Sequence, residues 1–184
     1  ITGASTGIGY ELAKIHAERG GSLILISADK DKLQKAAEKL SKKTKVEAIA
    51  IDLAKPGAAK RIHDKYRGKA DLLINNAGFG LAGTFDKTSL KTEQDMVAVN
   101  ISALMELTKH FLHDLKKKGK GRILNVSSTA SFQPGPLMAV YFATKPFVTS
   151  FSQAVNHELK GTGVTCTTLC PGATKTKFAK RARM

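Results

Sequence analysis

The chain has 184 residues, 42% of them hydrophobic, which is enough for one domain with a substantial core. No run approaches the roughly 18 apolar residues of a membrane span and no signal peptide is predicted, so we expect a cytoplasmic protein without an integral membrane segment. Thirty Lys and Arg residues against 15 Asp and Glu give a formal net charge of +15.

The positive charge is spread over residues 30–45, 116–122 and 175–183, without interleaved aromatic residues. Such aromatic residues serve as stacking platforms in single-strand nucleic-acid sites. A solvated basic surface is therefore favoured over nucleic-acid binding, and a phosphorylated cofactor or acyl carrier is the milder alternative.

Short apolar runs alternate with helical patterns along the chain. The predicted strands are 22–27, 46–51, 71–75, 122–127 and one that contains Cys166 and Cys170. Five helices are predicted. The first comes after the glycine-rich residues 2–9, the second is capped by Asp29 or Asp31, and the third spans 56–67 and is capped by Asp52. The fourth spans 93–118, and the fifth begins near Ala139. This alternation implies right-handed crossovers and an α/β fold with a doubly wound parallel sheet and helices on both faces.

Apolar stripes predict which helix faces are buried. For the first helix the stripe is Ile8, Leu12 and Ile15. For the long helix 93–118, with Thr92 and Asp95 as a capping box, it is Val97, Ile101, Leu104, Thr108, Phe111 and Leu115. Cys166 and Cys170 lie roughly 13 Å apart along a strand, too far for a disulfide, so both are expected to be core thiols.

Residues 2–9 read TGASTGIG and precede the first helix. Small residues let the backbone turn tightly and approach a diphosphate, while the N–H groups at the helix start face the anion. The glycine spacing differs from the commoner dinucleotide fingerprint, and a glycine-rich segment alone is equally compatible with a plain turn.

Tyr141 and Lys145 are four residues apart, so a helix that begins near Ala139 places them on one face. An ammonium beside a phenol lowers the tyrosine pKa from its ordinary value of about 10, which lets the phenol exchange a proton with a substrate oxygen. Ser128, after the strand 122–127, is placed to hold that oxygen. Taken alone, this tyrosine and lysine are more often a solvated pair.

These motifs occur together in a fixed order: residues 2–9, Asn75-Asn76-Ala77-Gly78, Asn100, Ser128, Tyr141, Lys145 and Pro171-Gly172. In order and spacing they resemble the short-chain dehydrogenase/reductase family, from Ile1 to about Phe178. The resemblance implies a single NAD(P)-binding Rossmann domain over residues 1–184. It also implies a fragment trimmed at both ends, in which the first strand and most of the C-terminal substrate lid are missing.

The resemblance assigns roles to four residues. Tyr141 is the acid/base, Ser128 positions the oxygen, Lys145 lowers the tyrosine pKa and holds the cofactor ribose, and Asn100 holds a water of the proton relay. A paired core amide is the alternative for Asn100. The family's cofactor-binding positions correspond to Gly3, Ser5, Thr6, Gly7, Ile8, Gly9, Ser27, Asp52, Leu53, Asn76, Ala77, Gly78, Tyr141, Lys145, Pro171, Gly172, Thr174 and Thr176.

The cofactor choice is read from the end of the strand 22–27. An acidic residue there selects NAD and a basic one favours NADP, but Ser27 and Ala28 are neither. Because Ser27 can bond a phosphate and Lys30 or Lys32 lie near, NADP is preferred over NAD. The alternative is that these lysines only decorate a helix start.

The expected reaction is hydride transfer between NAD(P) and a carbonyl or secondary alcohol, with a ketone, aldehyde or 3-oxoacyl compound as substrate. Apolar neighbours of Tyr141 suggest a lipophilic or acyl substrate: Phe132, Gln133, Pro134, Leu137 and Met138. Family members commonly form homo-oligomers through the two long helices. A non-catalytic nucleotide-binding or interaction protein is the alternative function.

Two further features affect these expectations. Pro146 follows Lys145 inside the predicted helix, where it removes a hydrogen bond and is expected to kink the helix. His110 and His113 are three apart without a third ligand, and His63 is isolated, so no metal site is predicted.

Overall fold

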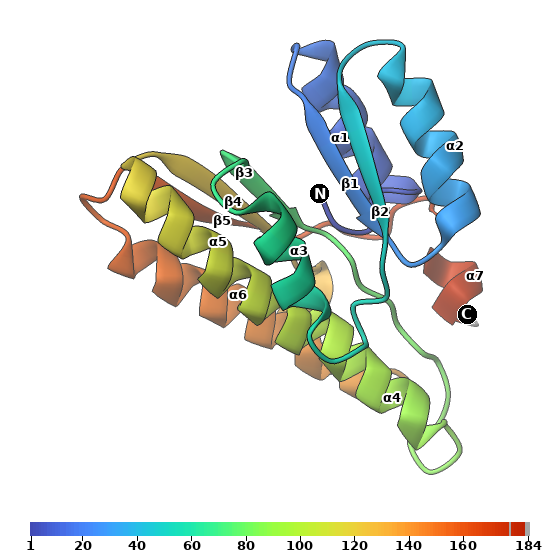
Figure 1. Ribbon diagram of the computed structural model, residues 1–184. Helices are drawn as coiled ribbons and strands as arrows, with labels where there is room; N and C mark the ends of the chain where they lie inside the picture. Colours follow the sequence, from blue (N-terminus) through green and yellow to red (C-terminus); the bar gives the residue numbers. More distant parts are fainter. Residues whose placement is uncertain (177, 183–184) are drawn as a thin grey trace.

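The computed structural model describes residues 1–176 and 178–182 (Figure 1). Residues 177 and 183 of the basic run 175–183 lie outside this part of the chain. The strands are β1 (Leu23–Ser27), β2 (Val46–Ala50), β3 (Leu72–Asn75), β4 (Gly121–Val126) and β5 (Val164–Leu169). All five correspond to predicted strands, with small differences in their ends.

The helices are α1 (Gly7–Glu18), α2 (Lys30–Ser41), α3 (Ala58–Tyr66), α4 (Leu90–Val97), α5 (Leu104–Lys118), α6 (Ala139–Glu158) and α7 (Phe178–Ala182). A π-helical turn, η1 (Ala98–Ala103), joins α4 to α5, and a 3-10 turn, η2 (Thr129–Phe132), follows β4. None of the helices in residues 1–176 and 178–182 is both long and apolar enough to cross a membrane.

All strand pairs are parallel: β1 with β2, and β3 with β4 and β5. Residues 1–4 lie between the two groups. On the β1 side, the Ile26 amide donates to the Ile1 carbonyl at 2.9 Å and the Ala4 amide donates to the Ile26 carbonyl at 3.2 Å. On the β3 side, the Thr2 amide donates to the Ile74 carbonyl at 2.9 Å. The order is therefore β2-β1-(1–4)-β3-β4-β5. The direction in which successive strands are added to the sheet reverses at residues 1–4. Doubly wound folds bind ligands at such a topological switch point.

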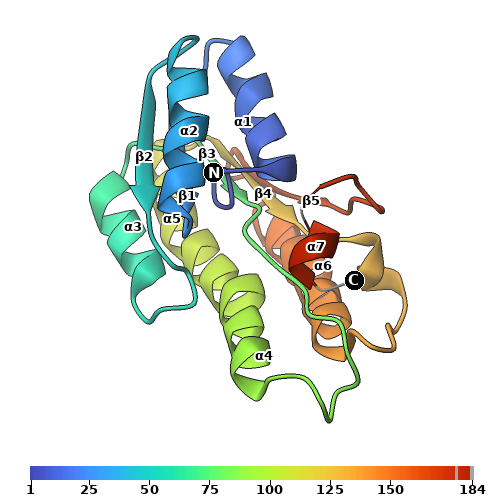
Figure 2. The ribbon, with the colours of Figure 1, turned by 90° about the vertical axis from the view of Figure 1, so that its right-hand side faces the viewer.

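Two apolar cores hold helices against the sheet. One joins α3, α5 and α6 to β3, β4 and β5, and includes Tyr66, Phe111 and Ile123. The other joins α1 and α2 to β1, and includes Ala13 and Leu25. Figures 1 and 2 show α5 and α6 running together beneath the three-stranded part, with α1 and α2 alongside β1 and β2. The predicted α/β fold with parallel strands and helices on both sides is confirmed.

The predicted buried stripe of α1 is wrong. Gly9, Ala13 and Ala17 face the core, whereas Ile15 is 47% exposed and Ile8 and Leu12 are only partly buried. A Cβ on Gly9 would lie 2.5 Å from the Gly3 carbonyl oxygen. Because the helix lies that close to the chain beneath it, only small residues fit on its inner face.

The helix predicted over 93–118 is continuous but not uniformly α-helical. The π turn has one residue more than an α-helical turn, so the helical residues before it are rotated about the helix axis relative to α5. As a result Met96 is buried and Val97 is 38% exposed. The expected stripe is therefore correct from Leu104 onward and wrong at Val97. Its cap is also different: the Ser89 hydroxyl accepts from the Thr92 amide at 3.3 Å.

Two other local predictions differ from the structure. Asp52 does not cap α3, because Gly57, with φ of +73°, precedes that helix and Asp52 accepts from the Ala54 amide at 3.0 Å. Cys170 lies just past β5 and is only partly buried. By contrast, α6 begins at Ala139 and has Pro146 in its interior, as predicted, within one helix of 20 residues.

His63 is buried, although its sequence context suggested an isolated residue. Its Nε2 lies 3.0 Å from the Asp114 carboxylate, and its ring stacks on His110 with centroids 5.0 Å apart. The same carboxylate accepts from the Gly68 amide at 3.0 Å. Asp114 of α5 thus holds both α3 and the turn that follows it.

Candidate active site

The predicted site residues follow the carboxyl ends of the strands. Ser27 ends β1, Asn76 follows β3, Ser128 follows β4, and Pro171 follows β5. In a parallel sheet these ends share one edge. The structure thus brings the motifs, which are far apart in sequence, to the same side of the molecule (Figure 2).

Ser128 lies close enough to Tyr141 to affect the ionisation of its phenol. Ser128 precedes η2, and its hydroxyl accepts from the Ala130 amide at 3.1 Å, which fixes its orientation. Burial raises the pKa of Tyr141 above its ordinary value, while a hydrogen bond to Ser128 partly opposes that rise. The Ser128 hydroxyl therefore influences the Tyr141 phenol just after the end of β4.

Lys145 is buried one helical turn after Tyr141. Its Nζ lies 5.6 Å from the centre of the Tyr141 ring and donates to the Val126 carbonyl at 3.1 Å. Burial lowers the pKa of Lys145 to about 8, and a nearby negative charge on Cys170 would oppose this change. At neutral pH the side chain is mostly the ammonium form.

The expected direction of the Tyr141 pKa shift is wrong in this structure. Desolvation raises that pKa, and the Lys145 ammonium is not among the causes that oppose the rise. Lys145 Nζ is bonded to the Val126 carbonyl of β4 and lies 5.6 Å from the centre of the Tyr141 ring. The phenol is therefore held in its protonated form at neutral pH.

Asn100 lies in the π turn and is almost fully buried. Its Nδ2 donates to the Phe79 carbonyl at 3.0 Å and to Thr144 Oγ1 at 3.1 Å, and its Oδ1 accepts from the Phe79 amide at 3.1 Å. A Cβ on Gly78 would meet Asn100 at 3.1 Å and Lys145 Nζ at 3.7 Å. The amide thus braces the loop after β3 directly beside Lys145, as the paired-amide alternative expects.

The glycine-rich segment is bonded to the loop after β3. Thr2 Oγ1 accepts from the amides of Asn76 and Ala77, each at 3.0 Å, and Asn76 Nδ2 donates to the Thr2 and Gly3 carbonyls at 3.0 and 3.2 Å. Gly3 has a left-handed φ of +64°. A Cβ at Gly9 would lie 2.4 Å from Asn76 Nδ2. These contacts explain why the sequence has glycine at both positions.

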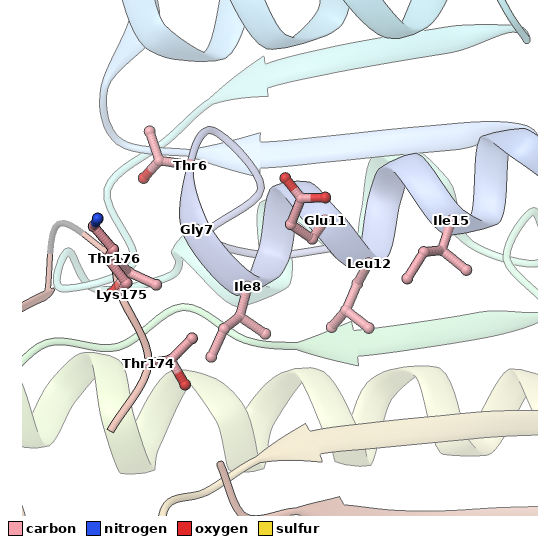
Figure 3. A pocket seen from close by; sticks show the side chains of 9 residues that line it. All are labelled: Thr6, Gly7, Ile8, Glu11, Leu12, Ile15, Thr174, Lys175 and Thr176. Atoms are coloured by element: carbon pink, nitrogen blue, oxygen red, sulfur yellow. The ribbon is translucent and has the colours of Figure 1, made fainter. Parts of the chain in front are cut away.

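The N-terminus of α1 fits a phosphate-containing cofactor. Thr6 makes no side-chain capping bond and the first turn has no acidic residue, so its amides are not capped by side chains. A groove of about 540 Å³ begins there and continues along α1 (Figure 3). Its lining comprises Thr6, Gly7, Ile8, Glu11, Leu12, Ile15, Thr174, Lys175 and Thr176.

The segment after Pro171-Gly172 reaches this groove. Thr176 is close to Gly7, because a Cβ built there would lie 3.4 Å from the Thr176 side chain. The Pro171 carbonyl accepts from the Thr129 amide at 3.0 Å, and Thr174 Oγ1 bonds the Gly172 carbonyl at 2.9 Å. Figure 3 shows residues 174–176 passing beside the first turn of α1.

The adenosine side of the expected cofactor site lies around Ser5 and Ser27. Ser5 Oγ and Ser27 Oγ lie 3.0 Å apart, and a hollow of about 270 Å³ near Ser5 is lined by Lys32, Lys35 and Lys39 among others. Asp52 is exposed at the end of β2, and Leu53 packs partly against the core.

The apolar neighbours of Tyr141 are only partly those expected. Met138 packs with Tyr141, but Phe132 and Leu137 are 70% and 58% exposed. Phe178 of α7 was missed; its ring lies 5.2 Å from the Tyr141 ring. No sequence signal places Phe178 there, because the contact depends on how the chain folds back after β5.

The family model described as short chain dehydrogenase matches residues 1–184. The very-long-chain 3-oxoacyl-CoA reductase of Bos taurus is 34% identical over 190 residues, which cover 100% of this chain and 61% of that relative. A short-chain dehydrogenase from Sphingobium yanoikuyae, solved in complex with NADPH, matches with a TM-score of 0.95 and 34% identity, over 100% of this chain and 73% of that one. The bulky-bulky ketone specific alcohol dehydrogenase from Comamonas testosteroni matches with a TM-score of 0.91 and 33% identity, over 95% of this chain and 72% of that one.

The chain spans about three fifths of the length of the curated bovine relative. The match to the family model covers every motif described above, from the glycine-rich segment to Pro171-Gly172. The sequence, the parallel sheet and the placement of Ser128, Tyr141 and Lys145 agree with that match. The chain belongs to the short-chain dehydrogenase family.

Proposed function

We propose that the full-length protein is an NAD(P)-dependent oxidoreductase that acts between a carbonyl and a secondary alcohol, with reduction of a ketone, aldehyde or 3-oxoacyl compound as its main direction. The observation that carries this proposal is the position of Lys145 Nζ 5.6 Å from the Tyr141 ring, with both residues buried and Ser128 close enough to affect the phenol. Residues 1–184 serve as one cofactor-binding domain.

NAD(P)H, when bound, supplies the hydride for this chemistry. Tyr141 donates a proton to the substrate oxygen, and its raised pKa supports this direction because the phenol begins in the protonated form. Ser128 holds the same oxygen through its hydroxyl group. Lys145, as an ammonium near the Tyr141 ring, stabilises the negative charge that forms on the phenol when it gives up its proton, in a buried, weakly screened site.

Asn100 has two proposed roles in this site. Its side chain holds the loop after β3 through both polar groups of Phe79. As a proposal, the residue also holds the water that passes protons to Lys145. The π turn supports a functional role, because such turns are frequent at functional sites.

The cofactor is proposed to be NADP in preference to NAD. Ser27 replaces the acidic residue that would repel a 2′-phosphate, and Ser5 stands beside it. Lys32, Lys35 and Lys39 add positive charge around the adjoining hollow. The Sphingobium neighbour, at 34% identity, is described in complex with NADPH. The groove at Gly7 and Ile8 would hold the pyrophosphate.

The substrate is proposed to be lipophilic or acyl. Tyr141 is bordered by an apolar cluster that includes Met138, Phe79 and Phe178, and such a wall favours an apolar group next to the reacting carbonyl. The bovine relative is named as a 3-oxoacyl-CoA reductase, and the Comamonas neighbour as an alcohol dehydrogenase specific for bulky ketones.

We further propose a cytoplasmic homo-oligomer. Val97 and Met105, on α4 and α5, remain 38% and 40% exposed, and Phe147 stacks on Phe151 of α6 with ring centroids 5.8 Å apart. Apolar side chains on long neighbouring helices suit an interface between copies. Light scattering of the full-length protein and cell fractionation test these two points.

The experiment uses the full-length protein and a Tyr141→Phe variant. NADPH and NADH binding is followed by fluorescence, and oxidation of the reduced cofactor is measured with ketones, aldehydes and 3-oxoacyl thioesters. We expect tighter binding of NADPH, turnover with an apolar carbonyl compound, and loss of turnover without loss of binding in Tyr141→Phe. A folded protein that binds neither nucleotide would contradict the proposal. Binding without turnover on every substrate would favour the non-catalytic alternative.

A further inference from the structure

Three hydroxyl groups contact one another between α6 and the segment that follows β4. They come from Ser127 after β4, Ser131 in η2 and Thr149 in α6. Ser127 Oγ lies 2.6 Å from Ser131 Oγ, and Thr149 Oγ1 lies 2.8 and 2.9 Å from Ser127 Oγ and Ser131 Oγ. We refer to these three residues as the hydroxyl cluster.

The cluster ends on the backbone of Lys145. Ser127 Oγ donates its proton to the Lys145 carbonyl at 2.9 Å. Since a hydroxyl has one proton, the short contact between Ser127 and Ser131 requires Ser131 to be the donor. Thr149 is then left to donate to Ser131 or Ser127, and its Oγ1 also lies 3.9 Å from Cys170 Sγ, where either atom could be the donor. The bonds from Ser131 to Ser127 and from Ser127 to the Lys145 carbonyl share one direction, towards Lys145.

The cluster holds the part of α6 that its own backbone bonds secure least well. Pro146 has no N–H group, so the Phe142 carbonyl lacks its usual helical donor. Lys145 is the residue just before this gap. It is fixed from outside the helix at two points, one at the end of β4 and one just after it: its Nζ donates to the Val126 carbonyl at 3.1 Å, and its carbonyl accepts from Ser127.

We propose that Ser127, Ser131 and Thr149 are positioning residues that hold the Lys145 turn of α6 against the end of β4, in place of the bond that Pro146 removes. This inference rests on the proposed function for its catalytic meaning. Tyr141 lies one turn earlier on the same face, so a tilt of this turn would change the distance between the phenol, Ser128 and Lys145 together. None of the three residues touches the reacting atoms in this role.

The consequence for Lys145 is direct. Its side chain remains buried only while α6 stays against β4, and this burial keeps its pKa at about 8. If the cluster is broken, the turn relaxes, water reaches Nζ, and the lysine pKa rises toward its ordinary value of 10.5. A purely structural cluster would affect stability without this change.

The test measures the pKa of Lys145 by NMR in the full-length protein, isotope-labelled at the lysine ε-carbon, with Lys145→Arg to assign the signal. The variants are Ser127→Ala and Thr149→Val, with Thr149→Ser as the conservative form that keeps the hydroxyl. Ser152→Ala is the matched control, because Ser152 is also a buried hydroxyl of α6 but bonds Val148 and Asn125.

We expect the Lys145 pKa to rise in Ser127→Ala and Thr149→Val and to stay at its wild-type value in Thr149→Ser and Ser152→Ala. In the enzyme assay the first two variants should lose kcat by up to about a hundredfold, the scale of a small misplacement, with KM little changed. Thr149→Ser should recover most of this loss.

The proposal is overturned if Ser127→Ala and Thr149→Val fold and keep the wild-type Lys145 pKa, or if Ser152→Ala shifts it equally. If Ser127→Ala does not fold, Thr149→Val and Ser131→Ala decide the question. The NMR titration requires neither cofactor nor substrate. An inactive wild-type protein would therefore count against the proposed function, whereas an unchanged Lys145 pKa would count against the positioning role.

Discussion

Asn100 and Phe79 are joined by two hydrogen bonds that run in opposite directions. The Asn100 amide donates to the Phe79 carbonyl at 3.0 Å and accepts from the Phe79 amide at 3.1 Å. The side chain thus pairs with a loop backbone much as a neighbouring strand would. This pairing fixes the loop that lies between the glycine-rich segment and Lys145.

We expect Asn100→Ala to lower the free energy of unfolding by about 2–4 kcal/mol, because two backbone groups lose their partner. Urea unfolding of the full-length protein measures this loss. Asn156→Ala is the control, since its side chain serves a single backbone group, the Cys166 amide at 3.0 Å. Equal losses in the two variants would contradict the special role of the Asn100 pair.

Gly9→Ala should be destabilising although alanine is the better helix former. The new Cβ would lie 2.4 Å from Asn76 Nδ2 and 2.5 Å from the Gly3 carbonyl oxygen, so the glycine-rich segment must move. We expect a loss of about 1–3 kcal/mol or more in thermal or urea unfolding. Gly172→Ala, whose Cβ would meet only Thr129 at 3.9 Å, should keep nearly wild-type stability.

Ser27→Asp should reverse the proposed preference for NADPH. A carboxylate at the end of β1 would repel a 2′-phosphate and accept bonds from the ribose hydroxyls of NADH. We expect the ratio of the NADPH to the NADH dissociation constant to rise by about ten- to a hundredfold, as direct repulsion between like charges would cause. Ser22→Asp adds the same charge just before the opposite end of β1 and should leave the ratio unchanged. A ratio that is insensitive to Ser27→Asp would place the 2′-phosphate elsewhere.

Lys145 should make stability depend on pH in alkaline solution. Its pKa is about 8 in the folded protein against 10.5 ordinarily, so between these values the unfolded chain binds the extra proton. The free energy of unfolding contributed by Lys145 therefore rises with pH across this window, by about 3 kcal/mol in total.

The measurement compares the wild type with Lys145→Met by urea unfolding from pH 7 to pH 11. Subtracting the two curves removes the groups that they share, such as Cys166, whose pKa is raised to about 11 by burial. The free energy of unfolding of the wild type should increase relative to that of Lys145→Met as the pH rises. A constant difference would mean that Lys145 keeps its ordinary pKa in the folded protein.

Local patterns were sufficient to find the strands and the order of the motifs. Apolar runs located β1 to β5, and parallel topology then required Ser27, Asn76, Ser128 and Pro171 to share one edge. The inference succeeded because apolar strands and the helices between them can each be recognised from short stretches of sequence, and their alternation implies parallel strands. Family resemblance added the expected roles of Ser128, Tyr141 and Lys145.

Features that depend on distant neighbours were not predictable in the same way. The inner face of α1 carries Ala13 and Ala17 because the space beneath it is small, not because they are the most apolar residues. The π turn at Asn100 shifts the face of α4 by one residue, so Val97 points outward. His63 is buried only because Asp114, 51 residues later, supplies its partner.

The sequence by itself determined the parallel α/β fold, the edge where the site lies and the residues that meet there. Only the tertiary structure decided how those residues are held and charged. Tyr141 is desolvated, so the phenol pKa is raised where the spacing alone predicted a lower one, and Lys145 is directed at the Val126 carbonyl. Burial and hydrogen-bond partners set the energy of a charge, and both are supplied by segments that are remote in the sequence.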